Sequence, residues 1–106
     1  MARTVSWSNT AVSDLRDVSE YIGRDSGAYA RALVSEVLAA ARSLRTLSER
    51  GRHVPEFDDP SYRELFIKSY RLIYRVSESK VFIIAFVHQA RDLGALLGKY
   101  EEHPGA

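Results

Sequence analysis

Residues 62–92 constrain the fold more than any other part of this chain. This segment, YRELFIKSYRLIYRVSESKVFIIAFVHQARD, contains three strand-like runs rich in aromatic and β-branched residues. Short polar stretches separate the runs, one near Lys68 and Ser69 and the other near Glu78 and Ser79. Because only antiparallel neighbours can be joined by such short turns, the segment predicts three consecutive antiparallel strands.

Basic side chains lie near the ends of these predicted strands: Arg63, Lys68, Arg71, Arg75, His88 and Arg91. The whole chain has a formal net charge of only +1, so it does not look like a strongly basic nucleic-acid binder. The small basic excess lies in residues 60–106, whereas residues 1–59 are slightly acidic. We therefore expect one face of the sheet to pack on the core and the other to meet an anionic partner.

The N-terminal part predicts one strand and two helices. Thr4 to Trp7 alternates as a short strand, and Ser8 or Asn9 can cap a helix with its side-chain oxygen. Apolar residues at helical spacing predict a first helix that ends near Arg24: Ala11, Leu15, Val18 and Ile22. A tight turn leads to a broader stripe on a long antiparallel second helix: Ala30, Leu33, Val34, Val37, Leu38, Ala41, Leu44 and Leu47.

The rest of the chain completes a single domain over residues 1–106, with a core at about residues 3–95 and a polar tail at residues 101–106. Residues 49–60 hold two prolines and Gly51 and predict a loop, and residues 92–100 suggest a short last helix. The predicted class is α+β, in the order β-α-α-β-β-β, with a small, mostly antiparallel sheet backed by a long helical hairpin.

Composition excludes several kinds of site. The chain has no cysteine, which rules out disulfides, thiolate metal sites and a cysteine nucleophile. Neither a secretion leader nor a membrane-spanning apolar run is recognisable, so we expect a soluble, cytoplasmic protein. We also expect no cofactor and no metal.

The last predicted strand is apolar on both faces. In residues 81–87, VFIIAFV, strict alternation would point Phe82, Ile84 and Phe86 away from the face that the helices cover. Either the C-terminal segment with Leu93, Leu96 and Leu97 covers this second face, or a partner protein does.

Five motifs, in this order and spacing, resemble the RelE/ParE superfamily of bacterial toxins from type II toxin–antitoxin modules: SNTAVSDLRDVSEYI, GRHVPEF, YREL, YRLIYRV and VHQARDL. The resemblance covers roughly residues 3–95. It implies a small sheet backed by two helices, and a cognate antitoxin that wraps the toxin with an extended or helical segment. The antitoxin contacts that we expect are Phe82, Ile84, Phe86, Leu96 and Leu97.

The superfamily contains two activities, and RelE-like members cleave messenger RNA on the ribosome. Such cleavage needs a base, an acid and cations around one phosphate. The resemblance implies Glu56, Arg71 and His88 as catalytic residues of a nuclease, and it implies Arg63, Arg71 and Arg91 as phosphate-binding residues. Two departures weaken this interpretation: Glu64 stands in a strand that is lysine-rich in some nucleases, and Tyr100 lies late for the C-terminal catalytic tyrosine.

ParE-like members instead inhibit DNA gyrase without hydrolytic chemistry of their own. The resemblance to them rests on the short Asp-Ser-Gly turn followed by AYARAL, and on the strand end VHQARD. Here Arg63, Arg71 and Arg91 would contact the target protein. We prefer the ParE-like interpretation and keep the RelE-like endoribonuclease as the alternative. A non-toxic nucleic-acid or protein binding module is the third possibility.

We also predict from the sequence whether particular side chains are exposed or buried. Arg71 opens a predicted strand, where its guanidinium would reach solvent, so Arg71→Ala should change stability by no more than about 1 kcal/mol. Trp7, Tyr70 and Tyr74 are predicted as core or cross-strand aromatics rather than as base-stacking platforms.

Overall fold

A computed structural model describes residues 2–93 of the chain, and residues 1 and 94–106 lie outside the description. The elements are β1 (Thr4–Trp7), α1 (Asn9–Gly23), α2 (Gly27–Ser43), β2 (Arg52–His53), β3 (Tyr62–Ile67), β4 (Tyr70–Val76) and β5 (Lys80–His88). The predicted order is confirmed, with one addition: the two-residue strand β2 interrupts the predicted loop. The suggested last helix lies almost wholly outside the described residues.

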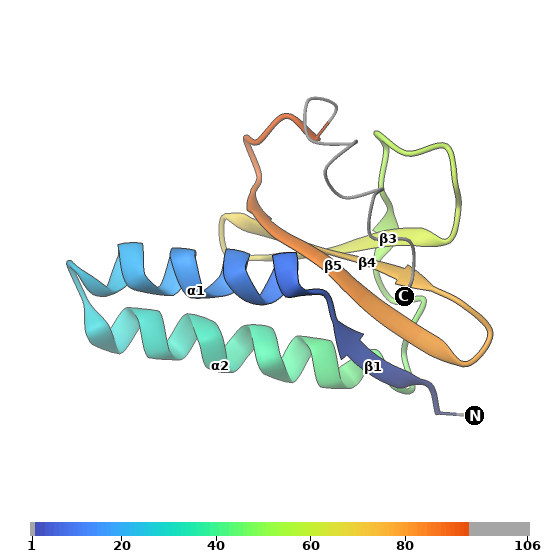
Figure 1. Cartoon of the computed structure of the whole chain (residues 1–106), viewed down its shortest axis with the longest axis horizontal. Coiled ribbons are helices and arrows are strands. Elements are labelled where there is room, and N and C mark those ends of the chain that lie inside the picture. Colours follow the sequence, from blue (N-terminus) through green and yellow to red (C-terminus); the bar gives the residue numbers. More distant parts are fainter. Residues whose placement is uncertain (1, 94–106) are drawn as a thin grey trace.

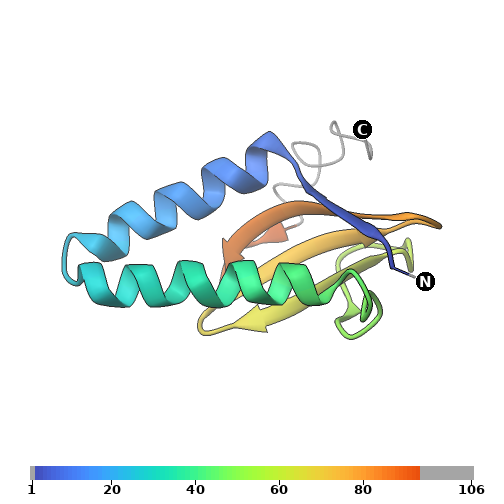
Figure 2. The same cartoon turned by 90° about the horizontal axis from the view of Figure 1, so that it is seen from below.

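The five strands form one sheet in the order β1-β5-β4-β3-β2, and the helical hairpin covers one face of it (Figures 1 and 2). β1 pairs with β5 in parallel, while the other neighbours are antiparallel. The first strand therefore lies beside the last, and β1 and β2 are the two edges of the sheet. Neither helix among residues 2–93 is long and apolar enough to cross a bilayer.

Capping side chains begin both helices. Ser8 Oγ accepts a hydrogen bond from the Ala11 amide at 2.9 Å, as predicted, and Ser26 Oγ accepts one from the Tyr29 amide at 3.1 Å. Each bond satisfies an amide that has no partner within its own helix. At the β3–β4 turn, Lys68 adopts a φ of 55°, which lets the chain reverse direction within two residues.

The main core lies between the helices and the sheet. Its buried members are Ala11, Leu33, Val37, Ala41, Leu44, Leu65, Ile67, Leu72, Tyr74, Val81, Ile83 and Phe86, with Trp7 and Tyr70 partly buried against them. The predicted aromatic core is thus confirmed. Two predicted members of the α2 stripe are exposed, however: Leu38 by 40% and Leu47 by 57%. Leu47 follows the end of α2 at Ser43, so the helical periodicity no longer applies to it.

A register shift in the β4–β5 pair changes which residues of β5 share a face. Ile73 pairs with Ala85 but Tyr74 pairs with Ile83, so Ile84 is an extra residue on β5. The strict alternation expected for this strand is therefore wrong, because Phe86 faces the helices and is only 1% exposed. Two side chains from the start of α1 and its cap bind backbone groups of β5 beside this shift. Ser8 Oγ donates to the Ile84 carbonyl at 3.0 Å, and Asp14 Oδ2 accepts a hydrogen bond from the Phe86 amide at 3.1 Å.

A second, smaller cluster covers the face of the sheet away from the helices. Its buried members are Val54, Ile73, Ile84, Ala85, Val87 and Leu93, with Phe57, Tyr62 and Phe82 packed against them. Leu93 is 1% exposed, so the segment after β5 does fold over this second face. Leu96 and Leu97, the other residues expected to cover it, lie outside the described residues.

Candidate functional site

Arg71 is the centre of the predicted site, and it is buried. It pairs across the sheet with Val87, which places its side chain on the face away from the helices. Its Nε donates to Glu64 Oε1 at 2.6 Å, and its Nη1 and Nη2 donate to the two carboxylate oxygens of Glu56 at 2.9 and 2.8 Å. With only 4% of the residue exposed, the expectation that this guanidinium reaches solvent is wrong.

Glu64 joins Arg71 to a second arginine. Its side chain is 0% exposed, and its other oxygen, Oε2, accepts a hydrogen bond from Arg52 Nε at 2.6 Å. The Arg52 guanidinium also lies 4.7 Å from the centroid of the Phe66 ring. Arg52, Glu64, Arg71 and Glu56 thus form a chain of alternating charges, which we call the Arg71 network. The network has no net charge.

Both ends of the Glu56–Arg71 pair are held in their charged forms. The hydrogen bond from Arg71 lowers the pKa of Glu56, and the hydrogen bond to Glu56 raises the pKa of Arg71. Because a lowered pKa makes a carboxylate a weaker base, this environment is unfavourable for general-base catalysis by Glu56.

His88 lies on the other face of the sheet. It pairs with Tyr70, and the two rings meet edge to face at 5.4 Å between centroids. Tyr70 in turn stacks on Phe86, which belongs to the core beneath the helices. The His88 Nδ1 accepts a hydrogen bond from the Ala90 amide at 3.1 Å. The structure therefore brings Glu56 and Arg71 together but separates them from His88 by the thickness of the sheet.

The two remaining predicted phosphate-binding arginines are also apart from Arg71. Arg63 Nη1 donates to the carbonyl oxygens of Gly51 at 2.7 Å and Glu49 at 3.2 Å, so this side chain fixes the turn before β2. Tyr74 Oη supports the same turn by accepting a hydrogen bond from the Gly51 amide at 3.0 Å. Arg91 is exposed beyond the end of β5. These positions do not create a common cationic face.

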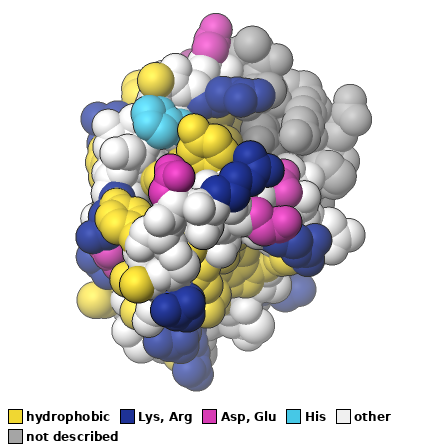
Figure 3. All heavy atoms as spheres, turned by 90° about the vertical axis from the view of Figure 1, so that its left-hand side faces the viewer, with side chains coloured by type: hydrophobic (Ala, Val, Ile, Leu, Met, Phe, Trp, Pro, Cys, Tyr) yellow, Lys and Arg dark blue, Asp and Glu magenta, His cyan; other side chains and the backbone are white. Residues whose placement is uncertain are grey.

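Figure 3 shows the end of the molecule that carries the turn between the helices, where basic and acidic side chains lie side by side. An ion pair between two exposed side chains connects Lys68 Nζ with Glu36 Oε1 at 3.4 Å. Of the basic residues in the strand segment, Lys68 and Arg71 are thus paired with carboxylates, and Arg63 is bound to carbonyl oxygens. Arg71, which the sequence analysis placed at the centre of the basic face, is therefore buried and neutralised.

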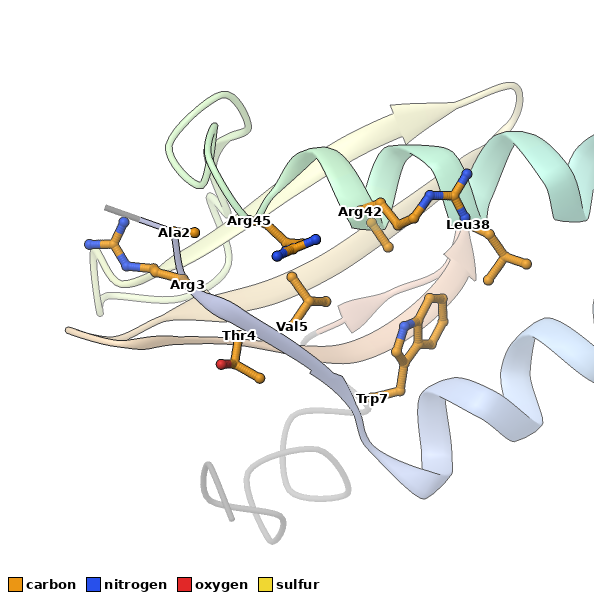
Figure 4. Close-up of a pocket in the computed structure, with 9 residues that line it drawn as sticks. Ala2, Arg3, Thr4, Val5, Trp7, Leu38, Arg42 and Arg45 are labelled. Carbon is orange, nitrogen blue, oxygen red and sulfur yellow. The ribbon is translucent and has the colours of Figure 1, made fainter.

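Two hollows near β1 were not predicted from the sequence. An apolar groove of about 480 Å³ runs between the two helices and is lined by Trp7, Val12, Leu15, Arg16, Ser19, Val34 and Leu38. A cleft of about 460 Å³ adjoins this groove, and Trp7 and Leu38 line both hollows. Arg3, Arg42 and Arg45 also line the cleft (Figure 4). Their lining residues come from segments far apart in the sequence, so no local motif reveals them.

Comparisons with known proteins place this architecture in a family. Residues 5–93 match the model of the ParE toxin of the type II toxin–antitoxin system parDE. Toxin RelE2 of Caulobacter vibrioides is 34% identical over 92 residues, which are 86% of this chain and 99% of that protein.

Solved structures share the fold. The chromosomal ParDE toxin–antitoxin system from P. aeruginosa superposes with a TM-score of 0.69 at 18% identity, covering 82% of this chain and 96% of that one. The RelBE2 toxin–antitoxin complex of Mycobacterium tuberculosis gives 0.61 at 22% identity, over 83% of this chain and 99% of that one. A mutant of E. coli toxin RelE in the free state gives 0.58 at 16% identity, over 98% and 99%. The chain therefore belongs to the ParE toxin family, within the RelE/ParE superfamily, and is a toxin of a type II toxin–antitoxin system.

Proposed function

We propose that this toxin is ParE-like: it inhibits DNA gyrase by binding, without cleaving RNA, and a cognate antitoxin neutralises it. The observation that carries this proposal is the Arg71 network. The strongest candidate phosphate ligand of a nuclease is 4% exposed and bound by two carboxylates.

A ribonuclease site needs an acid, a base and a cation around one phosphate. In this fold Glu56 occupies the Nη1 and Nη2 donors of Arg71, which are the donors that would bind a phosphate in a bidentate fashion. His88 lies on the opposite face. An inhibitor that acts by binding requires none of these groups to converge, so the arrangement favours gyrase inhibition over ribosome-dependent cleavage.

The test compares the two targets with the same protein preparation. Purified toxin is added to gyrase with relaxed plasmid, and separately to ribosomes engaged on a messenger RNA. We expect loss of supercoiling and intact messenger RNA. Cuts in the ribosome-bound messenger RNA with normal supercoiling would instead establish the RelE-like activity, which the name of the Caulobacter relative favours. A protein that affects neither target and permits growth would be a binding module.

The antitoxin requires an accessible apolar surface. Of the contacts expected on β5, Ile84 and Phe86 are 4% and 1% exposed, which leaves Phe82 as the accessible one. The groove between the helices offers more, because Val12 and Leu38 are each 40% exposed. We infer that an apolar segment of the antitoxin covers this groove, since burying such side chains is favourable and non-directional.

This inference is tested by Leu38→Glu, co-expressed with the antitoxin encoded next to the toxin gene. Because the side chain is exposed, we expect normal folding and toxicity but weaker neutralisation. Leu47→Glu is the matched control, since Leu47 is exposed by 57% and does not line the groove. Full neutralisation of the Leu38 variant would exclude the groove as the antitoxin site.

A further inference from the structure

Four arginines from two separate segments lie around the C-terminal end of α2. Arg3 precedes β1, Arg42 lies in the last turn of α2, and Arg45 and Arg50 follow it. We call these four residues the basic corner. Two small hollows connect its members: Arg3, Arg42 and Arg45 line the cleft beside β1, and Arg3 and Arg50 line a neighbouring depression.

Within the part of the chain that the structure describes, no ion pair neutralises this corner. Among residues 2–93 the arginines and lysines paired with carboxylates are Arg52, Lys68 and Arg71, none of which belongs to the corner. Arg3 donates to the Ser77 carbonyl at 2.8 Å and to Ser48 Oγ at 2.6 Å, and Arg50 donates to Ser43 Oγ at 2.8 Å. These partners orient the guanidinium groups but leave their charge in place.

One basic residue in the last turn of a helix is common, because it complements the negative end of the helix dipole. That explanation accounts for Arg42 alone. Glu49 lies between Arg45 and Arg50 in the sequence and lines the depression with Arg3 and Arg50, and Glu78 lies in the turn whose Ser79 carbonyl accepts a hydrogen bond from the Thr4 amide. Four arginines against two glutamates leave an excess of positive charge at this end of the molecule.

The backbone groups at the open edge of β1 distinguish between two kinds of anionic partner, an acidic peptide and a nucleic acid. An extended acidic peptide would add a strand at the open edge of β1. The Arg3 amide at that edge already donates to the Arg45 carbonyl at 2.8 Å, and the Thr4 and Ser8 amides donate to β5 or the turn before it. Since backbone groups alternate in direction along a strand, only Val5 and Trp7 retain outward amides, which is too short an edge for a stable added strand.

Phosphate groups fit the remaining features better. Figure 4 shows Arg42, Arg45 and Trp7 around the cleft, whereas the Thr4 hydroxyl points to the other side of β1. Guanidinium forks are side-chain groups that bind the phosphate oxygens of a nucleic-acid backbone. We propose that the basic corner binds the phosphate backbone of double-stranded DNA, independently of its sequence. This binding does not depend on gyrase inhibition, although a toxin that meets gyrase would meet it on DNA.

The experiment measures binding of the purified toxin to a fluorescein-labelled duplex of arbitrary sequence by fluorescence anisotropy, over a series of salt concentrations. In Arg42→Gln/Arg45→Gln we expect weaker binding, and the slope of log K against log salt should fall in magnitude by about 1.8, since each phosphate contact contributes about 0.9. The matched control is Arg24→Gln/Arg31→Gln, which removes the same charge from exposed arginines near the turn between the helices. The control should keep the wild-type slope.

Three results would overturn the proposal. The first is no binding of wild-type toxin to the duplex at low salt, and the second is an equal loss of slope in the control. The third is binding of poly-glutamate as tight as that of the duplex at equal charge concentration, which would assign the corner to an acidic protein. Because gyrase is absent from the assay, none of these outcomes depends on which enzyme the toxin inhibits.

Discussion

The Arg71 network and the basic corner use the same kind of side chain in opposite ways. In the network, Arg71 is 4% exposed and two carboxylates neutralise it. In the corner, Arg42 and Arg45 are exposed and form no ion pair with any carboxylate of residues 2–93. The sequence suggests the reverse, because the strand segment has the basic excess and the N-terminal part does not. Net charge along a sequence thus did not predict where unneutralised charge lies in the fold.

Burial explains the difference. A charged group that leaves water loses its hydration, and the loss is tolerated only when opposite charges and hydrogen bonds replace it. Glu64 satisfies that requirement for Arg71, and Arg71 and Arg52 satisfy it for Glu64. An arginine at the surface has no such requirement and remains available to a ligand. Arg71 is thus a structural cation, whereas Arg42 and Arg45 are available to a ligand.

The largest expected effect is that of Arg71→Ala. Removing the guanidinium leaves Glu64, whose side chain is 0% exposed, with Arg52 as its one remaining cation. Breaking a buried pair in this way typically costs about 3–5 kcal/mol in the free energy of unfolding. Urea denaturation of both proteins measures the difference. A change under about 1 kcal/mol, as exposed substitutions give, would mean that the network does not stabilise the fold.

Gly51→Ala should have the next largest effect, because it disturbs the turn that Arg63 and Tyr74 hold. A Cβ at this position would lie 2.5 Å from both the Glu64 carbonyl oxygen and Tyr74 Oη. Relieving such a clash in a packed region costs about 1–3 kcal/mol. Gly23→Ala is the control, since its added Cβ meets the Ala30 Cβ at an ordinary 3.8 Å. Thermal melting compares the two, and equal melting temperatures would refute tight packing at Gly51.

The Glu56–Arg71 pair predicts a pH dependence of smaller size. Folding lowers the pKa of Glu56 below its ordinary value of 4.5, mainly through the hydrogen bond from Arg71. Its contribution to stability is therefore fully present above pH 4.5 and is lost as the pH falls through the lowered pKa. The melting temperature of wild type should exceed that of Glu56→Gln at neutral pH, and the two should converge in acid. A pH-independent difference would contradict this linkage.

The smallest expected effect belongs to the basic corner. Arg45→Ala removes an exposed guanidinium without a carboxylate partner, so the free energy of unfolding should change by less than about 0.5 kcal/mol. Urea denaturation beside Arg71→Ala shows the contrast directly. A loss as large as that of Arg71→Ala would show that Arg45 is structural, and the comparison between the two regions would fail.

Elements with clear local signals were predictable from the sequence. The cap at Ser8, the two hairpin turns and most of the helical stripes follow from periodicity and turn residues, and the structure confirms them. Leu38 and Leu47 are the exposed exceptions. The extra residue at Ile84 was not predictable from local sequence. The side chains of Ser8 and Asp14, more than seventy residues away, bind the backbone of β5 at this position. Because of this single register shift, strict alternation assigned Phe86 to the wrong face of the sheet.

The candidate site was predictable only in part. The family resemblance implied Glu56 and Arg71 for one catalytic site, and the structure joins the two side chains in an ion pair, while their catalytic role stays a prediction. Their pairing with buried Glu64, and the location of His88 on the other face, depend on strand register, which residue spacing alone does not give. The same holds for the basic corner, where Arg3 joins Arg42 and Arg45 only because β1 lies beside the end of α2.

The central claim is that the Arg71 network stabilises the toxin and performs no chemistry. The most direct test replaces three members of the network in one variant, Glu56→Gln/Glu64→Leu/Arg71→Met, and keeps Arg52, whose side chain is 58% exposed. Replacing a buried ion pair, here Glu64 and Arg71, with apolar residues of similar volume is often neutral for stability. Growth arrest is then measured at matched soluble expression, beside the melting temperature. We predict a folded variant that arrests growth as wild type does. A variant that melts like wild type but permits normal growth would contradict the account, because Glu56, Glu64 or Arg71 would then act directly in toxicity.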